Sequence, residues 1–86
     1  AELYSNVSGR DLKIYTTQPS IQIYTGNYLA GCPVGKNRRI YGDYSGVAME
    51  TQHFPDSPNH PEYPTTELLP GQTYNEATVY VFGIKK

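Results

Sequence analysis

The stretch "VAMETQHFPDSPNH", residues 47–60, decides which fold class the chain adopts. Its first half alternates between two sets of side chains, Val47, Met49, Thr51 and His53 against Ala48, Glu50, Gln52 and Phe54. A period of two residues is typical of a half-buried β-strand, because successive side chains of a strand point to opposite faces. The second half is dense in proline, which cannot donate to a strand ladder. The stretch therefore predicts a strand over 46–54 that carries the carboxylate of Glu50, followed by a loop.

The same alternation recurs in three other stretches, "DLKIYTT" (11–17), "IQIYT" (21–25) and "EATVYVFGI" (76–84). Turn formers separate them, among them "LPGQ" (69–72), in which glycine follows proline. No stretch places apolar residues at the spacing of an amphipathic helix over three turns. Four or five strands with long connections predict an all-β fold, either an antiparallel sheet or a β-sandwich.

The length of the chain bounds its core. A chain of 86 residues buries only about 60–65% of the surface that its unfolded form exposes, so an independent core would be thin. Long loops and half-buried sheet faces need a partner layer to lie against. We therefore expect the chain to be part of a larger β-sandwich, or to pair with a second chain.

Composition argues against several classes of partner. Seven Lys and Arg stand against eight Asp and Glu, so the formal charge of −1 favours neither nucleic acid nor an anionic membrane. No apolar run approaches the roughly 20 residues of a membrane helix, and "AELYSNVSGR" (1–10) lacks a signal-peptide core. Cys32 is the only cysteine, which allows no internal disulfide and suits a cytoplasmic location.

Glu50 is the first candidate for chemistry. An isolated glutamate on a strand most often faces solvent, but its neighbours on the same face are small, amide and aromatic, as in the lining of a pocket. A carboxylate in such a pocket can act as a general base when a hydroxyl comes within hydrogen-bonding reach. The nine tyrosines suit either strand packing or a sugar-like ligand, since each has an apolar face and a hydroxyl.

Other motifs give weaker signals. The set His53, Asp56 and His60 matches no standard zinc spacing, so we expect no metal and assign the histidines to the surface or to bracing of the loop. "AGCPVGKN" (30–37) fails the phosphate-loop pattern at its first and last residues, and Cys32 has no nearby histidine to activate it.

The loop is expected to be ordered and extended, because five of its residues are prolines with a fixed φ: Pro55, Pro58, Pro61, Pro64 and Pro70. A rigid loop of this kind could form the wall of a pocket. It could equally cover the edge of a sheet, which is the commoner use.

Three blocks then point to a family: "IYTTQPSIQIYTGNYL" (14–29), "SGVAMETQHFPDSPNHPEYP" (45–64) and "LLPGQTYNEATVYVFG" (68–83). Their order and spacing resemble the C-terminal part of the aldose 1-epimerases, the galactose mutarotases, from about Ser8 to the end of the chain. The resemblance implies an antiparallel β-sandwich, the galactose mutarotase-like supersandwich. Residues 1–86 would be the C-terminal segment of one such domain, with the remainder missing on the N-terminal side.

The resemblance also implies an activity, the interconversion of α and β anomers of free hexoses such as galactose and glucose. The catalytic base of the family falls on Glu50, and its substrate-binding glutamine falls on Gln22. Proton transfer alone drives this reaction, so neither a metal nor an organic cofactor is expected. The family's acid histidine lies in an upstream block, and neither His53 nor His60 matches its motif. The 86 residues alone are therefore expected to be inactive.

Two alternatives remain open at this point. A non-catalytic carbohydrate-binding β-domain would suit the tyrosine content and the hydrogen-bonding groups of Gln22 and Glu50. An inert fragment of a longer protein would also have this sequence.

Overall fold

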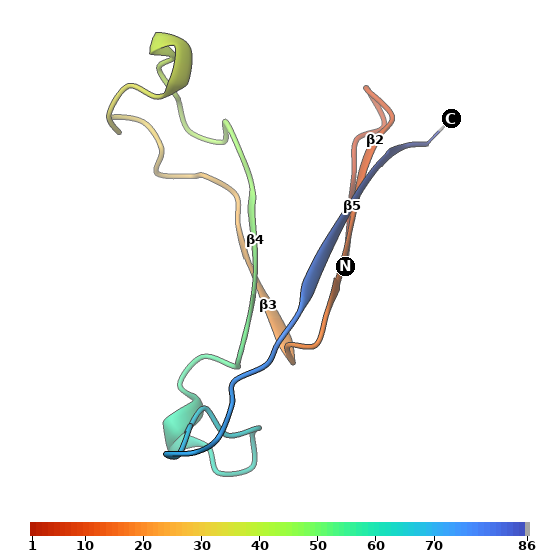
Figure 1. The fold of residues 1–86 in the computed structure, drawn as a ribbon. Coiled ribbons are helices and arrows are strands. Elements are labelled where there is room, and N and C mark those ends of the chain that lie inside the picture. Colours follow the sequence, from red (N-terminus) through yellow and green to blue (C-terminus); the bar gives the residue numbers. More distant parts are fainter. Residues whose placement is uncertain (86) are drawn as a thin grey trace. The chain divides into compact units, whose positions relative to one another are not determined.

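The computed structural model describes residues 1–85, which form strands and two short 3-10 helices (Figure 1). In chain order these are β1 (Glu2–Tyr4), β2 (Arg10–Thr16), β3 (Ser20–Tyr24), η1 (Lys36–Arg38), β4 (Ala48–Gln52), η2 (Ser57–Asn59) and β5 (Thr78–Ile84). Over the described range no helix has the length and apolar character needed to cross a membrane. The prediction of an all-β chain is confirmed.

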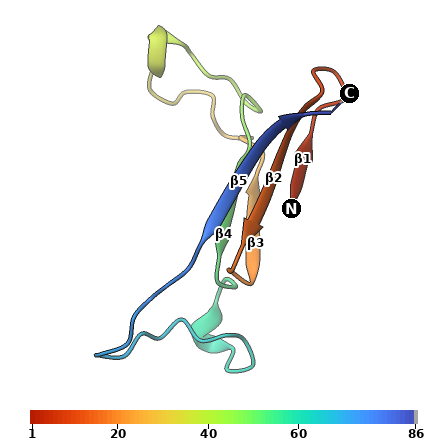
Figure 2. The ribbon, with the colours of Figure 1, turned by 45° about the vertical axis from the view of Figure 1, so that its right-hand side comes forward.

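The strands form two sheets. One has the order β1-β2-β5 and is antiparallel throughout, with Leu3 opposite Leu12 and Ile14 opposite Tyr80 (Figure 2). The other pairs β3 with β4. The described residues divide into two compact units, one of residues 21–50 and the other of residues 1–20 and 51–85.

Four of the observed strands match predicted ones, with shorter or shifted bounds. β2 and β3 each begin one residue earlier than predicted, whereas β5 begins two residues later. β4 ends at Gln52 rather than at Phe54, ahead of Pro55, which has no backbone N–H to donate to a strand ladder. β1 was not predicted, because three residues are too few for an alternation to be recognised.

The predicted turn at "LPGQ" is present. The backbone N–H of Gln72 donates to the carbonyl of Leu69 at 3.0 Å, and Gly71 has a φ of +85°. Proline at the second position and a left-handed residue at the third are the signature of a type II turn, which favours glycine there. This turn precedes the chain's approach to β5.

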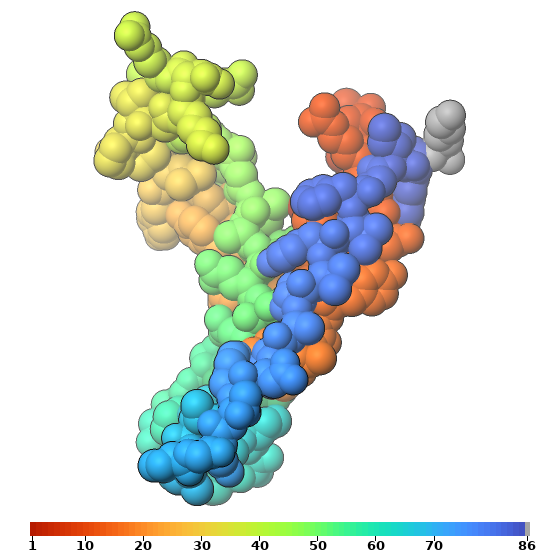
Figure 3. All heavy atoms as spheres, viewed as in Figure 1, coloured from red at the N-terminus to blue at the C-terminus, as the bar shows by residue number. Residues whose placement is uncertain are grey.

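The buried core is thin, as the length of the chain predicts. Among residues 1–85, Ile14 is the one hydrophobic side chain that is fully buried, at 3% exposure. β5 lies along β2 (Figure 3), yet apolar side chains of β5 remain exposed: Val79, Val81, Phe82 and Ile84. Uncovered apolar strand residues of this kind are typical of a sheet that is built to pack against more protein.

Within the unit of residues 21–50, Gly26 closes the end of β3. Its φ is +72°, and a Cβ atom there would lie 2.8 Å from the carbonyl oxygen of Gly46. The carbonyl of Gly26 also accepts a hydrogen bond from the backbone N–H of Tyr44 at 2.7 Å. Only glycine fits both the backbone conformation and this close approach.

Charged side chains from β1, β2 and the end of the chain meet beside the three-stranded sheet. Lys85 Nζ lies 2.9 Å from Glu2 Oε2, and this contact lowers the pKa of Glu2 and raises that of Lys85. Asp11 is nearly buried, and this desolvation, followed by its contact with Glu2, raises the pKa of the Asp11 carboxyl. Ionised Asp11 is therefore unfavourable in the folded state, whereas ionised Glu2 and Lys85 stabilise it.

The thin core gives the first prediction. Ile14→Ala in the full-length protein should lower the free energy of unfolding by about 2–5 kcal/mol, because it opens a cavity at a fully buried site. Chemical denaturation measures this change. The control Val7→Ala, at a residue that is 94% exposed, should stay close to the parent; equal losses in both variants would contradict the assignment of Ile14 to the core.

The second prediction concerns pH. A raised pKa for Asp11 means that its contribution to stability is intact below the ordinary value of 3.8 and is lost as the pH rises through the higher folded-state pKa. Asp11→Asn cannot ionise and avoids that loss. Its thermal midpoint relative to the parent should therefore be higher near pH 7 than near about pH 3. A relative midpoint for Asp11→Asn that falls with pH would refute the assignment.

Candidate functional site

The two predicted site residues lie on neighbouring strands. Gln22 is the central residue of β3 and Glu50 is the central residue of β4. The hydroxyl of Ser20 donates to the carbonyl of Gln52 at 2.8 Å, and the two strands run in opposite directions (Figure 1). Gln22 and Glu50 therefore lie on two neighbouring strands of one sheet.

Both side chains are open to solvent. Glu50 and Gln22 are exposed, whereas the face-mates Ala48, Gln52 and Phe54 are half-buried. The two strands therefore present an exposed carboxylate and an exposed amide, groups that can accept from and donate to the hydroxyls of a small polar ligand.

Hydroxyl groups hold the end of β4 that follows Glu50. Thr51 Oγ1 lies 2.8 Å from Thr78 Oγ1, which in turn lies 3.0 Å from Thr16 Oγ1. All three threonines fall within predicted strands, but no role was predicted for them. The sequence shows only that Thr51 follows Glu50. It does not indicate that Thr51 contacts Thr78, which is far away in sequence.

The proline loop after β4 is ordered but not extended. It contains η2, with a proline in its first turn, and Asp56 ahead of η2 has a left-handed φ of +61°. The prediction of an extended loop is wrong, because the prolines alternate with turn-forming residues that reverse the chain. Two consecutive turns produce this reversal. The backbone N–H of His60 donates to the carbonyl of Ser57, and the backbone N–H of Tyr63 donates to the carbonyl of His60, both at 3.0 Å.

His60 braces this loop from within. Its Nε2 lies 3.1 Å from Asp56 Oδ2 and its Nδ1 lies 3.1 Å from Glu62 Oε1. Its ring also stacks on Tyr63, with centroids 4.6 Å apart. The interpretation of His60 as a loop-bracing histidine is confirmed. Over the described part of the chain no group of three His, Cys, Asp or Glu side chains could hold a metal ion.

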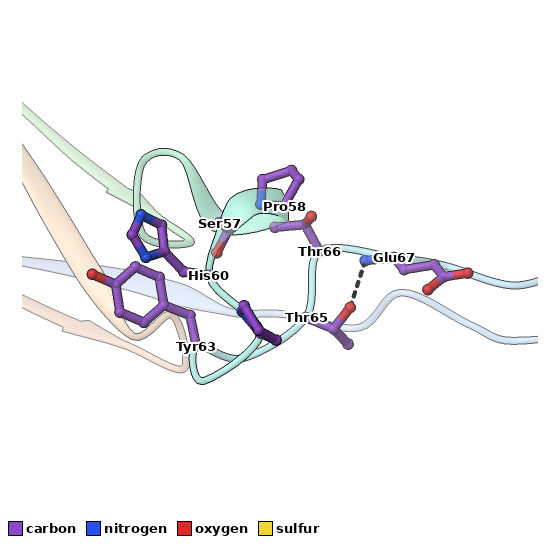
Figure 4. A pocket seen from close by; sticks show the side chains of 8 residues that line it. Ser57, Pro58, His60, Tyr63, Thr65, Thr66 and Glu67 are labelled. Atoms are coloured by element: carbon purple, nitrogen blue, oxygen red, sulfur yellow. Dashed lines mark hydrogen bonds between the residues drawn. The ribbon is translucent and has the colours of Figure 1, made fainter.

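A pocket of about 390 Å³ opens in the same loop (Figure 4). Its lining is mostly polar or proline: Ser57, Pro58, His60, Pro61, Tyr63, Thr65, Thr66 and Glu67. The close-up shows the stacked rings of His60 and Tyr63 on one side, and the hydrogen bond from Glu67 N–H to Thr65 Oγ1 on the other. The loop therefore supplies a rigid wall, one of the two uses that its proline content predicts.

The weaker motifs carry no site in the structure. The motif "AGCPVGKN" (30–37) ends in η1, a single turn formed by Lys36–Arg38. Asn37 in this turn has a left-handed backbone. A phosphate loop instead leads into a full helix whose N-terminus binds the anion. Cys32 is a free thiol and half-buried.

Comparison with known proteins agrees with the resemblance of the three blocks. A family model described as aldose 1-epimerase matches residues 1–81, so it begins earlier than the Ser8 expected from the motifs. Galactose mutarotase of Mus musculus is 49% identical over 77 residues, covering 90% of this chain and 22% of that protein.

Two further relatives give similar values. Galactose mutarotase of Homo sapiens is 44% identical over 84 residues, covering 98% of this chain and 25% of that protein. Aldose 1-epimerase of Escherichia coli is 43% identical over 84 residues, covering 95% of this chain and 24% of that protein. The chain thus spans about a quarter of the length of these curated relatives.

A family model that matches nearly every residue, together with relatives of this identity in mammals and a bacterium, settles the classification. The chain belongs to the aldose 1-epimerase family.

Proposed function

We propose that this chain carries the general base of an aldose 1-epimerase that interconverts the α and β anomers of free hexoses such as galactose and glucose. The observation that carries the proposal is the match of almost the whole chain to proteins named galactose mutarotase and aldose 1-epimerase. The exposure of Gln22 and Glu50 on the neighbouring strands β3 and β4 supports it, because both polar groups are open to solvent.

Glu50 is assigned the first proton transfer. Its carboxylate accepts the proton of the C1 hydroxyl of the closed sugar ring, and the electron pair of that O–H bond forms the C1 carbonyl. The C1–O5 bond breaks, and the ring oxygen receives a proton from an acid. Rotation about C1–C2 and reclosure on the other face, with both transfers reversed, give the second anomer. Atoms and charges balance without an oxidant or a metal.

Gln22 is assigned to substrate binding. A side-chain amide offers two N–H donors and one carbonyl acceptor, so it can hold a sugar hydroxyl in either role. A position on the strand next to that of Glu50 would let the amide orient the ring while the carboxylate reaches C1.

The acid is assigned to polypeptide outside these residues. Both ring nitrogens of His60 lie at hydrogen-bonding distance from carboxylates of its own loop. They are therefore not directed at a sugar. The acid and the remaining sugar contacts would come from the rest of the same protein or from a second chain that completes the β-sandwich. All experiments below therefore use the full-length protein.

We assign the protein to galactose and hexose metabolism in the cytoplasm. The free thiol of Cys32 fits a reducing compartment. The balanced charge of the chain gives no support to a nucleic acid or an anionic membrane as partner.

Replacement of the base tests the proposal. Glu50→Gln keeps the size of the side chain and removes the proton acceptor, so kcat for α-galactose mutarotation should fall by about 10²–10⁴-fold. Polarimetry follows the reaction. The control Glu67→Gln, an exposed loop carboxylate, should retain the parent rate. A parent rate in Glu50→Gln would remove Glu50 from the mechanism. Galactose binding by a full-length parent that does not catalyse mutarotation would favour the carbohydrate-binding alternative.

Removal of the amide tests the role of Gln22. Gln22→Ala should raise KM for galactose by roughly 3- to 10-fold with a smaller change in kcat, which corresponds to one lost hydrogen bond of about 1 kcal/mol. Steady-state kinetics separates the two constants. Gln72→Ala removes an amide from the turn before β5 and serves as the matched control. An unchanged KM for Gln22→Ala would take Gln22 out of the sugar site.

A further inference from the structure

Three threonine hydroxyls from three strands form a hydrogen-bonded chain. Thr51 of β4 contacts Thr78 of β5 at 2.8 Å, Thr78 contacts Thr16 of β2 at 3.0 Å, and Thr16 lies 3.2 Å from the carbonyl of Ala77, to which it donates. Each hydroxyl has one hydrogen to donate. Because Thr16 donates to the carbonyl, Thr78 donates to Thr16 and Thr51 donates to Thr78. All three hydroxyls therefore donate in the same direction, from Thr51 through Thr78 and Thr16 to the backbone carbonyl of Ala77.

The other end of this series of hydrogen bonds is Thr51, the residue next to Glu50. Successive side chains of a strand point to opposite faces, so an anchor on Thr51 restrains the strand backbone from which the Glu50 side chain extends to the other face. Thr51 and Thr78 are half-buried, which limits competition from water for their hydroxyls.

A second anchor acts on the following residue. Ser20 donates to the carbonyl of Gln52, which is two residues after Glu50, and Ser20 itself lies two residues before Gln22. The segment after Glu50 is therefore held by one side-chain bond and one backbone bond. Neither bond involves the carboxylate of Glu50.

We propose that Thr51 is a positioning residue for the base Glu50, and that Thr78 and Thr16 hold it in place. The inference rests on the proposed function, since it assigns the hydroxyl chain to the same proton transfer. A misplacement of a reacting group by about 1 Å can cost on the order of 10²-fold in rate. A strand that is free to shift by a fraction of that distance would therefore lose activity without losing the carboxylate.

The test replaces the central hydroxyl. Thr78→Val in the full-length protein keeps the shape and β-propensity of the side chain but breaks both of its hydroxyl contacts. Thr78 lies 27 residues from Thr51 in sequence, so the two residues are not local neighbours in the chain. We expect kcat for galactose mutarotation to fall by about 10- to 100-fold with KM within about twofold of the parent. Thr78→Ser, which keeps the hydroxyl, should restore most of kcat.

Two controls separate positioning from general support of the fold. Thr73→Val removes an exposed hydroxyl from the segment that precedes β5, and it should leave kcat at the parent value. In a Glu50→Gln background, Thr78→Val should cause no further loss of kcat, because no base is left to position. Thermal midpoints of all variants are measured alongside the rates.

Either of two outcomes overturns the inference. A lower thermal midpoint for Thr78→Val with an unchanged kcat would make the hydroxyl chain a support of the sheet only. An equal further loss in the Glu50→Gln background would make its effect independent of the base. Retention of activity by Glu50→Gln alone would instead refute the proposed function, so the two failures can be told apart. Should Thr78→Val fail to fold, Thr16→Val breaks the exposed outer link and carries the same test.

Discussion

The hydrogen bonds that hold the end of β4 are the constraint on which the rest of the account depends. The Ser20 hydroxyl fixes the pairing of β3 with β4, and the Thr51 hydroxyl ties β4 to Thr78. A shift of one residue in the pairing of two strands would send every side chain of β4 to the opposite face. The proposed shared role of Gln22 and Glu50 depends on this pairing.

Burial explains why these polar contacts carry so much weight. Ile14 is the one fully buried hydrophobic side chain of the described residues, and β5 keeps large apolar side chains in solvent. The hydrophobic effect therefore specifies little of the arrangement by itself. Directional bonds between threonines, the glycine at Gly26 and the turn at Gly71 provide the specificity instead. Curated relatives about four times as long have further polypeptide that could cover the apolar strands.

Much of this structure could be predicted from alternation and turn residues. The strands that became β2 to β5 were found from their period of two, and the Pro70–Gly71 turn from its composition. β1 is too short for such a pattern. The proline loop was wrongly expected to be extended, because a fixed φ at each proline does not determine the residues between them. Asp56 takes a left-handed conformation there and turns the chain.

The site residues could likewise be predicted from the sequence, whereas the contacts around them could not. Gln22 and Glu50 were selected through the family resemblance and assigned to strands by alternation, and the structure places those strands next to each other. The hydroxyl chain could not be predicted, since Thr16, Thr51 and Thr78 meet only after three strands come together. His60 was correctly assigned to bracing, although its partners Asp56 and Glu62 were not named in that role.

A crystal structure of the full-length protein with D-galactose bound tests the central claim most directly. The account predicts an oxygen of Glu50 at hydrogen-bonding distance, about 2.6–3.2 Å, from the C1 hydroxyl, with the Gln22 amide on another hydroxyl of the same sugar. A sugar bound elsewhere, with the Glu50 carboxylate turned to bulk solvent, would contradict it.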